Sequence, residues 1–389
     1  MDESQFGSSG SGPASSYESS VNLLAVRKQR EQDELNAYIR EVREHFETVP
    51  HFRFEEYVSR GGYGVTALIS QQGFGLRRDR KLIVKRAIHN SARELRKEIR
   101  IMQKLNGSAH IARIVASKDD TDAAQGWHQL SPLRRLADRI RGSPPPNLLA
   151  GLAGPTLVLE YLENGTLNRL RARITRARAT VPNRVLWSIF LCLMRSCVAM
   201  SYPPDAPPGS EPRLEEIPQN PPDDAQRGYI HTDMHPGNII VGSLRDFPDH
   251  SRVPVVKLID FGLALESNVS APRNILDASK NILWLITHRL DIIGPQRGVY
   301  KGIETMAYPL LPNDITGEEP YPSLDLDLRD LLVQCMAGDR DVRPTLAGVL
   351  EIAKRAVQER NAEFYGPRRP LESDEAVRQF VQHFIYDAD

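Results

Sequence analysis

Cysteine is scarce in this chain. The 389 residues include three cysteines, Cys192, Cys197 and Cys335, which are too few and too apolar in their surroundings for a disulfide framework or a zinc site. Two of them lie in an apolar stretch at 185–200, where we expect them to pack as small hydrophobic side chains. So few cysteines suit a reducing compartment, and we expect a cytoplasmic or nuclear protein.

The chain also lacks an excess of charge and a long hydrophobic run. Fifty Lys and Arg residues balance fifty Asp and Glu residues, which argues against a surface dedicated to nucleic acid or to a membrane. The longest apolar runs, such as 189–194, are far shorter than a membrane span, and we expect no secretory leader. We therefore expect neither a nucleic-acid nor a membrane partner.

Two short stretches in the second half carry residues suited to phosphoryl transfer. Residues 229–241 read Y-I-H-T-D-M-H-P-G-N-I-I-V, and residues 257–264 read K-L-I-D-F-G-L-A. The first places Asp233 and Asn238 five positions apart, and the second places Asp260 directly after an apolar run typical of a strand. They resemble the H-R-D-x-x-x-x-N and D-F-G motifs of the eukaryotic-type protein kinase family, in a divergent, fungal-like form.

The resemblance implies an enzyme that depends on ATP and Mg²⁺. Asp260 and Asn238 would bind Mg²⁺ through oxygen atoms, the ligands that this cation prefers. Asp233 would orient the acceptor hydroxyl or take its proton. His235 stands where many Ser/Thr kinases have a lysine near the γ-phosphate, and a histidine contact there would depend on pH.

The same stretch has a second interpretation as a metal cluster. On an extended strand, His231, Asp233 and His235 share one face, as the ligands of a zinc site can. This interpretation gives no role to Asn238 or to the downstream Asp260. The ordered pair of motifs therefore favours phosphoryl transfer.

Residues upstream supply further parts of the resemblance in the same order. The stretch 57–68, Y-V-S-R-G-G-Y-G-V-T-A-L, resembles the glycine-rich loop that covers the nucleotide, with Ser59 in place of its first glycine. Glycines there let backbone amides approach phosphate oxygens. The residues matched to the loop are Gly61, Gly62, Gly64 and Val65.

The remaining nucleotide-binding positions follow by resemblance. Lys85, at the end of L-I-V-K, would bind the α- and β-phosphates, and Glu98, on the predicted helix 93–105, would form an ion pair with it. Leu159 would be the gatekeeper residue. Glu160 and Leu162 would present backbone groups to the adenine edge.

These motifs predict an α+β fold of protein-kinase type, with a small β-rich N-lobe and a larger helical C-lobe. Arg343 and Pro344 match the closing segment of the family. Two proline-rich insertions are interpreted as surface loops. The predicted divisions are a disordered Ser/Gly-rich tail at 1–20, an amphipathic helix at 21–50, an N-lobe at 51–163 with an insertion at 117–150, a C-lobe at 164–365 with an insertion at 201–228, and a C-terminal extension at 366–389.

Several positions depart from the family. Thr232 replaces the arginine that pairs with a phosphorylated activation loop, and Asp277, which begins a helix-like run, follows Asp260 by only 17 residues. We therefore expect activity that does not require activation-loop phosphorylation. Ile83 replaces an alanine above the adenine, and the larger side chain would narrow the nucleotide pocket.

Three functions are compatible with these residues. A protein kinase that phosphorylates Ser/Thr hydroxyls is favoured by the glycine-rich loop, the Lys85–Glu98 pair and the C-terminal D-R-D-V-R-P-T. The string H-T-D-M-H-P-G-N and the short activation segment also resemble small-molecule kinases of the aminoglycoside and choline phosphotransferase type. A third possibility is a pseudokinase scaffold, which Ser59, Ile83 and Thr232 favour.

Overall fold

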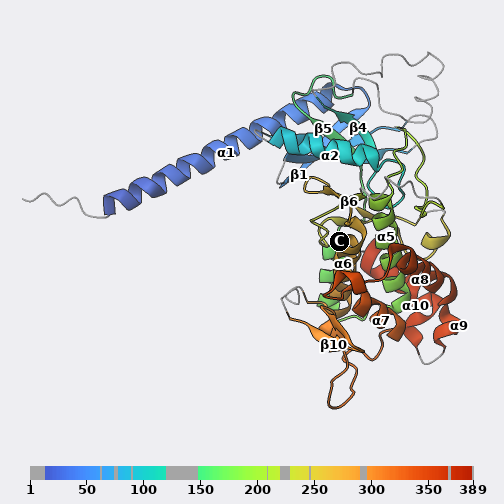
Figure 1. The fold of residues 1–389 in the computed structure, drawn as a ribbon. Coiled ribbons are helices and arrows are strands. Elements are labelled where there is room, and N and C mark those ends of the chain that lie inside the picture. The colour runs from blue at the N-terminus through green and yellow to red at the C-terminus, as the bar shows by residue number, and fades with distance from the viewer. Residues whose placement is uncertain are drawn as a thin grey trace, which may run out of the picture.

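The computed structural model describes residues 14–61, 64–73, 78–88, 91–119, 148–207, 209–219, 228–244, 247–289, 296–366 and 369–387. The chain forms a two-lobed α+β fold, as the sequence predicted, with an antiparallel sheet in its first part and a mainly helical second part (Figure 1). Residues 1–13, Gly62 and most of the insertion at 117–150 lie outside the described residues.

The N-lobe is built on one five-stranded antiparallel sheet. Residues on β3 alternate between its two faces: Leu82 and Val84 pack in one apolar cluster, and Ile83 packs against another. Lys85 therefore lies on the same face as Ile83. The strands, in the order β1-β2-β3-β5-β4, are β1 (Phe52–Gly61), β2 (Gly64–Gln71), β3 (Arg80–Ala87), β4 (Ile114–Lys118) and β5 (Thr156–Glu160).

Two helices cover the two faces of this sheet. α2 (Ala92–Lys104) buries Leu95, Ile99 and Met102, spaced as on one helix stripe, in the cluster on the Lys85 face. α1 (Ala14–Thr48) covers the opposite face with its C-terminal half, and its first half projects away from the lobe (Figure 1). The helix expected over 21–50 corresponds to α1, which begins earlier, at Ala14.

The docking of α1 depends on its apolar positions Val42 and Phe46. Both side chains are fully buried, and the Phe46 ring lies 6.1 Å from the ring of Phe52 on β1. We expect Phe46→Ala to lower the free energy of unfolding by about 3–5 kcal/mol, because it leaves a cavity between helix and sheet. Urea unfolding measures this loss, and Glu44→Ala, at an exposed position of α1, is the matched control. Equal stability of the two variants would contradict the docking.

The C-lobe is mainly helical. Its α-helices are α4 (Leu167–Ala177), α5 (Asn183–Ser201), α6 (Ser270–Thr287), α7 (Leu326–Cys335), α8 (Leu346–Glu359), α9 (Ala362–Tyr365) and α10 (Asp374–Val381). Shorter helical turns are η3 (Pro248–His250), η4 (Tyr308–Leu310), η5 (Arg340–Val342), η6 (Pro370–Glu372) and the π-helical η7 (Gln382–Tyr386).

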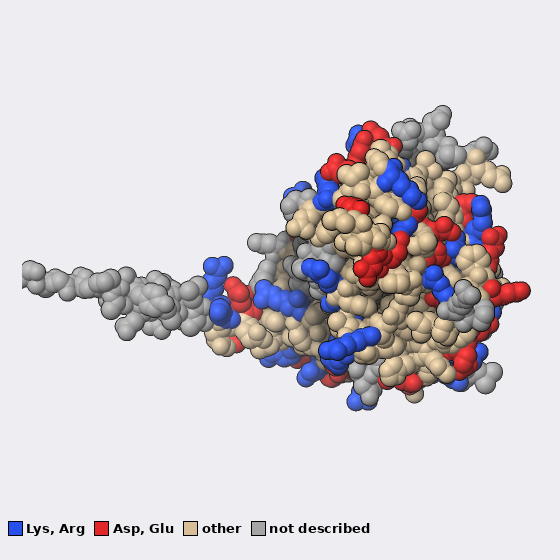
Figure 2. All heavy atoms as spheres, turned by 90° about the horizontal axis from the view of Figure 1, so that it is seen from below, with Lys and Arg blue, Asp and Glu red and all other residues tan. Residues whose placement is uncertain are grey.

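Helix α5 is the centre of this lobe and packs against α6 and α8. By length and composition alone it could cross a membrane, but 94% of the stretch concerned is buried inside the protein. A helix that is apolar all round and enclosed by other helices is typical of the core of a large domain. On the face of the molecule shown in Figure 2, basic and acidic side chains are interspersed.

Short two-stranded ladders complete the C-lobe. β6 (Gly228–Ile230) pairs with β9 (Leu265–Ser267), β7 (Ile239–Val241) with β8 (Val256–Leu258), and β10 (Gly298–Tyr300) with β11 (Ile303–Thr305). The first two ladders flank both sequence motifs. They hold the segment between β6 and β7 beside the segment between β8 and β9.

The described part of the insertion at 201–228 lies at the surface, as its prolines predicted, but specific contacts hold it against the lobe. The Asn106 side chain donates to the carbonyl oxygens of Ala206 and Pro207, and the Ala109 amide donates to that of Arg213. Glu215 is buried. Polar contacts from the loop after α2 therefore fix this segment, although its composition is that of an extended linker.

The string Ala271-Pro272-Arg273 lies inside α6, in the same helix as Asp277. It is therefore not a separate segment that ends an activation loop. Arg343 nevertheless reaches it, because one of its guanidinium nitrogens donates to the Pro272 carbonyl oxygen at 3.0 Å. This bond ties the closing segment of the lobe to the start of α6.

Candidate active site

Lys85 is the centre of an ion-pair network that joins the two lobes. Its Nζ atom lies 2.6 Å from Oε2 of Glu98 on α2 and 2.9 Å from Oδ1 of Asp260, which follows β8. Burial alone lowers the pKa of Lys85, but the two carboxylates raise it above its ordinary value. The lysine therefore stays charged and is held in place from both sides, as a phosphate-binding ammonium group must be.

Asp260 has an unusual backbone conformation that aims its carboxylate. Its φ is 63°, a left-handed value that aspartate tolerates better than most residues. The next residue, Phe261, is fully buried with its ring 4.7 Å from that of His231. Burial would raise the pKa of Asp260, but the Lys85 ammonium holds it below its ordinary value. The carboxylate is therefore ionised and about one third exposed.

The segment between β6 and β7 places Asp233 beside Asn238. The Asn238 Nδ2 atom donates to the Asp233 backbone oxygen at 3.0 Å and to its Oδ2 at 3.1 Å. Because the amide nitrogen faces Asp233, the Asn238 side-chain oxygen points elsewhere. That oxygen and the Asp260 carboxylate are hard donors that fit Mg²⁺.

Three hydrogen bonds hold the Asp233 segment against the Asp260 segment. The His231 Nε2 atom lies 2.9 Å from the Ile259 carbonyl oxygen, the Ile259 amide donates to the Asn238 carbonyl oxygen, and the Thr232 hydroxyl donates to the Leu263 carbonyl oxygen. Thr232 also has a left-handed φ, of 61°. The two motifs, far apart in the sequence, are thus adjacent.

Two asparagines of α6 support the Asp233 segment and were not singled out from the sequence. Asn274 accepts a hydrogen bond from the His231 amide and donates to the Tyr229 carbonyl oxygen. Asn281 donates to the Met234 carbonyl oxygen. They position the catalytic segment, and no local pattern marks them, because asparagines in a helix usually face solvent.

His235 is half exposed and lies beside Asp233. Its Nε2 atom is 3.6 Å from Asp233 Oδ2, and its Nδ1 accepts the Gly237 amide at 3.0 Å. His231, in contrast, is buried against a carbonyl oxygen that can only accept, so its Nε2 carries a proton and cannot bind a metal. Among the described residues, His231, Asp233 and His235 do not converge as a metal-binding group, and the zinc interpretation of this stretch is wrong.

The glycine-rich hairpin differs in detail from the prediction. Gly61 pairs with Gly64 at the tip of β1 and β2, and a Cβ atom on Gly64 would lie 2.2 Å from the Arg86 carbonyl oxygen. Gly64 is thus required by the close approach of β3, independently of any phosphate. Gly62 lies outside the described residues.

Val65 was predicted to contact the nucleotide, and its position in the structure contradicts this prediction. It pairs with Arg86 and is buried with Leu35 of α1, so it lies on the face opposite to Lys85. Thr66 pairs with Lys85 and shares its face. The family motif G-x-V places its valine two residues after the last glycine, which corresponds to Thr66. A shift of one residue along a strand exchanges the faces of a sheet.

The segment at the end of β5, which was predicted to contact the adenine edge, makes contacts within the protein. The Glu160 amide donates to the Arg113 carbonyl oxygen, and its carboxylate forms an ion pair with Lys257 Nζ at 2.5 Å. This amide is therefore not available to adenine. Leu162 is buried, next to Gly242. The assignment of Leu162 and of the Glu160 carbonyl to the adenine edge stays a prediction.

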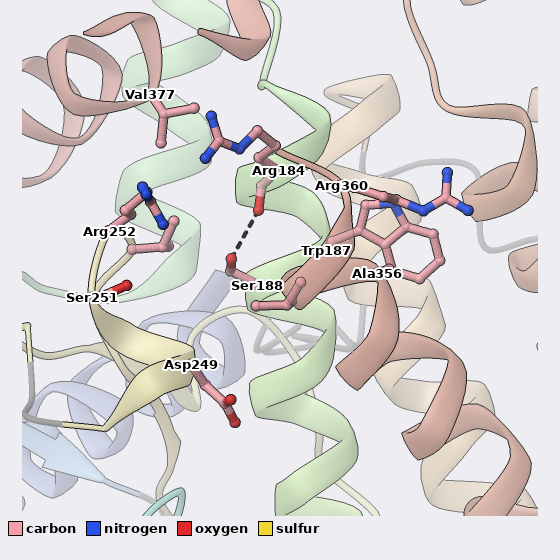
Figure 3. Close-up of a pocket in the computed structure, with 11 residues that line it drawn as sticks. Arg184, Trp187, Ser188, Asp249, Ser251, Arg252, Ala356, Arg360 and Val377 are labelled. Atoms are coloured by element: carbon pink, nitrogen blue, oxygen red, sulfur yellow. Dashed lines mark hydrogen bonds between the residues drawn. The ribbon is translucent and has the colours of Figure 1, made fainter. Parts of the chain in front are cut away.

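A small pocket of about 50 Å³ lies elsewhere, among α5, η3, α8 and α10 (Figure 3). Its charged groups already have protein partners: Arg184 pairs with Asp374, and Arg360 with Asp325. A space of this size holds about one or two water molecules. It is built from elements other than those that carry Asp233 and Asp260, and we assign it no part in the chemistry.

The two-lobed fold and the Lys85–Glu98–Asp260 network have the arrangement expected of a kinase-like phosphotransferase. In agreement, the family model described as the phosphotransferase enzyme family (APH) matches residues 72–265. The matched region begins after β2, ends at β9, and contains Lys85, Asp233 and Asp260. The match supports a kinase-like family and does not single out the eukaryotic protein kinases that the motifs first suggested.

Proposed function

We propose that this protein transfers the γ-phosphoryl group of ATP, with Mg²⁺, to the hydroxyl group of a small molecule. The observation that carries the proposal is the simultaneous contact of Lys85 with Glu98 and Asp260. It gives the ammonium group one position, between the sheet and the metal-binding aspartate. Retention of this network together with Asp233 and Asn238 argues against a scaffold that has lost catalysis.

Each residue then has a distinct task. Lys85 binds phosphate oxygens, and Asp260 and the Asn238 oxygen hold the cations, which neutralise charge on the phosphates. Asp233 orients the acceptor hydroxyl and takes its proton, and His235 lies beside it to contact the acceptor or the γ-phosphate. The chain positions the reactants and excludes competing orientations, which is most of what phosphoryl transfer needs.

The short connection after Asp260 favours a small acceptor. Helix α6 begins at Ser270, ten residues after Asp260, and β9 occupies part of this interval. A connection of this length offers little extended backbone against which a peptide could lie. The match to the APH family agrees with a small acceptor.

A Ser/Thr hydroxyl on a protein is the second candidate acceptor. It is favoured by the exposed apolar side chains Leu263, Leu265 and Val269, each about half exposed beside the Asp233 segment. Such side chains can contact an extended peptide.

With either acceptor, we expect activity that does not depend on phosphorylation of the segment after Asp260. That segment is short, and the Thr232 hydroxyl already binds it through the Leu263 carbonyl oxygen. Phosphatase-treated protein should therefore keep full activity.

The experiment is a radiolabel transfer assay with [γ-³²P]ATP and Mg²⁺ against amino alcohols, sugars and aminoglycosides, with a peptide library in parallel. We expect label in a small molecule for the wild type and none for Asp260→Asn. Label in peptides alone would select the protein kinase. A thermal shift with Mg-ATP is measured alongside, because ligand binding raises the melting temperature. No shift at millimolar nucleotide and no transfer to any acceptor would overturn the proposal.

A further inference from the structure

Four buried polar side chains that have no part in the proposed phosphoryl transfer meet where the loop after α2 contacts the C-lobe. His110 lies in the loop between α2 and β4, Cys192 in the middle of α5, Glu215 in the insertion, and His250 at the end of η3. All are almost completely buried. The possible ligand atoms of His110, Cys192 and His250 lie within 4.8 Å of one another. No local pattern groups these residues, and the scarcity of cysteine predicted that the chain has no zinc site.

Glu215 fixes the orientation of the His110 ring. Its carboxylate accepts two hydrogen bonds from His110, one from the ring Nδ1 at 2.6 Å and one from the backbone amide at 2.8 Å. A carboxylate can only accept, so Nδ1 must carry the proton, and in the neutral ring Nε2 presents a lone pair. A carboxylate that holds a histidine in this way is the usual support of a metal-binding imidazole.

The His110 lone pair faces a second imidazole. The Nε2 atoms of His110 and His250 lie 2.9 Å apart, and His250 Nδ1 lies 4.0 Å from the Cys192 sulfur. Two imidazole nitrogens at this distance repel each other unless a proton or a cation lies between them. Two nitrogens on one tetrahedral Zn²⁺ are about 3.3 Å apart, so a small outward movement of the rings would admit the ion.

A divalent ion also matches the buried charge around the cluster. Arg195 contacts Asp249 at 2.5 Å and donates to the Glu215 carbonyl oxygen, so that its charge is matched by Asp249. When zinc binds, the Cys192 thiolate and the Glu215 carboxylate place two negative charges beside neutral imidazoles, and one divalent ion neutralises both.

We propose that His110, Cys192 and His250 bind one zinc ion, with Glu215 as the support of His110. One thiolate and two imidazoles are a donor set that suits Zn²⁺ better than Mg²⁺ or Ca²⁺. Binding releases the thiol proton and any proton shared by the two rings, and no oxidant or reductant is needed. Three protein ligands leave the fourth position of a tetrahedral site to water.

The role of the ion follows from where its ligands come from. It joins the loop that follows α2 to the core helix α5 and to η3, and through Glu215 it fixes the insertion. None of its ligands is a residue assigned to phosphoryl transfer, so the role we propose is structural, and it includes support of β8, because the His110 carbonyl oxygen accepts the Leu258 amide two residues before Asp260. The metal-free alternative is a proton shared between His110 and His250, with the same four residues in a hydrogen-bonded chain.

The test uses the full-length protein and two cysteine variants. Protein purified without chelators is assayed for zinc by mass spectrometry, and metal-free protein is titrated with Co²⁺, whose bond to a thiolate gives a charge-transfer absorption. Cys192→Ser is compared with Cys197→Ser, a fully buried cysteine of the same helix outside the cluster. We expect one equivalent of zinc and the absorption in the wild type and in Cys197→Ser, and neither in Cys192→Ser.

Two further measurements guard against a variant that does not fold. Removing zinc from the wild type with a chelator should lower its melting temperature, and added zinc should restore it. Glu215→Gln should weaken zinc binding by roughly 10–100-fold, as expected for loss of a supporting carboxylate. Wild-type protein that contains no zinc, shows no cobalt absorption and melts at one temperature with and without chelator would overturn the proposal in favour of the shared proton.

Discussion

Asp233→Asn is expected to lower kcat by roughly two to four powers of ten, because the variant cannot take the proton of the acceptor hydroxyl. The substitution keeps the size of the side chain, and an asparagine oxygen can still accept the bond from Asn238 Nδ2. The loop should therefore keep its shape, and Mg-ATP should still raise the melting temperature. Single-turnover transfer of ³²P and a thermal shift measure the two effects separately.

The control for this variant is Asp341→Asn, at an exposed position on η5. It should transfer phosphate at the wild-type rate. If Asp233→Asn kept its rate within tenfold of the wild type, Asp233 would be a structural residue and another group would have to act as the base. His235, next to Asp233, would be the first to examine.

Lys85→Met is expected to abolish transfer and also to destabilise the fold. Glu98 is completely buried beside Lys85, and removing one partner of a buried ion pair costs about 3–5 kcal/mol, because the other charge is left uncompensated. Urea unfolding measures the loss of stability. Lys81→Met, at an exposed position of the same strand, should change neither quantity.

A double variant separates the two roles of Lys85. Lys85→Met with Glu98→Leu removes both charges, so most of the lost stability should return while transfer stays absent. Recovery of activity in the double variant would show that Lys85 does not bind phosphate. Failure to recover stability would show that the cost comes from packing and not from the buried carboxylate of Glu98.

The residues assigned to the candidate active site could be predicted from the sequence because each lies in a short local motif. Asp233, Asn238 and Asp260 are specified by neighbours within a few positions, and Lys85 and Glu98 by a strand followed by an amphipathic helix. In the structure, the ion pairs of Lys85 bring the segments of Glu98 and Asp260 together. The acceptor was not recognisable, because it is decided by the surface around Asp233 and not by the motifs.

Other features depend on contacts that no local pattern encodes. Val65 lies on the α1 face because the β2 register sets it opposite Arg86, and a one-residue error in aligning the hairpin reverses the assignment. Glu215 is buried in a proline-rich segment that reads as solvated linker. Cys192 was correctly expected to be buried, but its two histidine neighbours come from positions 82 residues before and 58 residues after it, and only the tertiary structure joins them.

One contact of α1 has a consequence for the enzyme as a whole. Arg86, the residue after Lys85, is buried on the other side of β3, where it pairs with Glu41 at 2.8 Å and lies over the ring of Tyr38. Two adjacent residues of β3 thus face opposite sides of the sheet: Lys85 faces the candidate active site, and Arg86 binds the N-terminal helix. A chain that lacked residues 14–41 would lose both contacts and leave the buried Arg86 guanidinium without its carboxylate partner, one position from Lys85. We therefore expect removal of the N-terminal helix to disturb the candidate site as well as the fold.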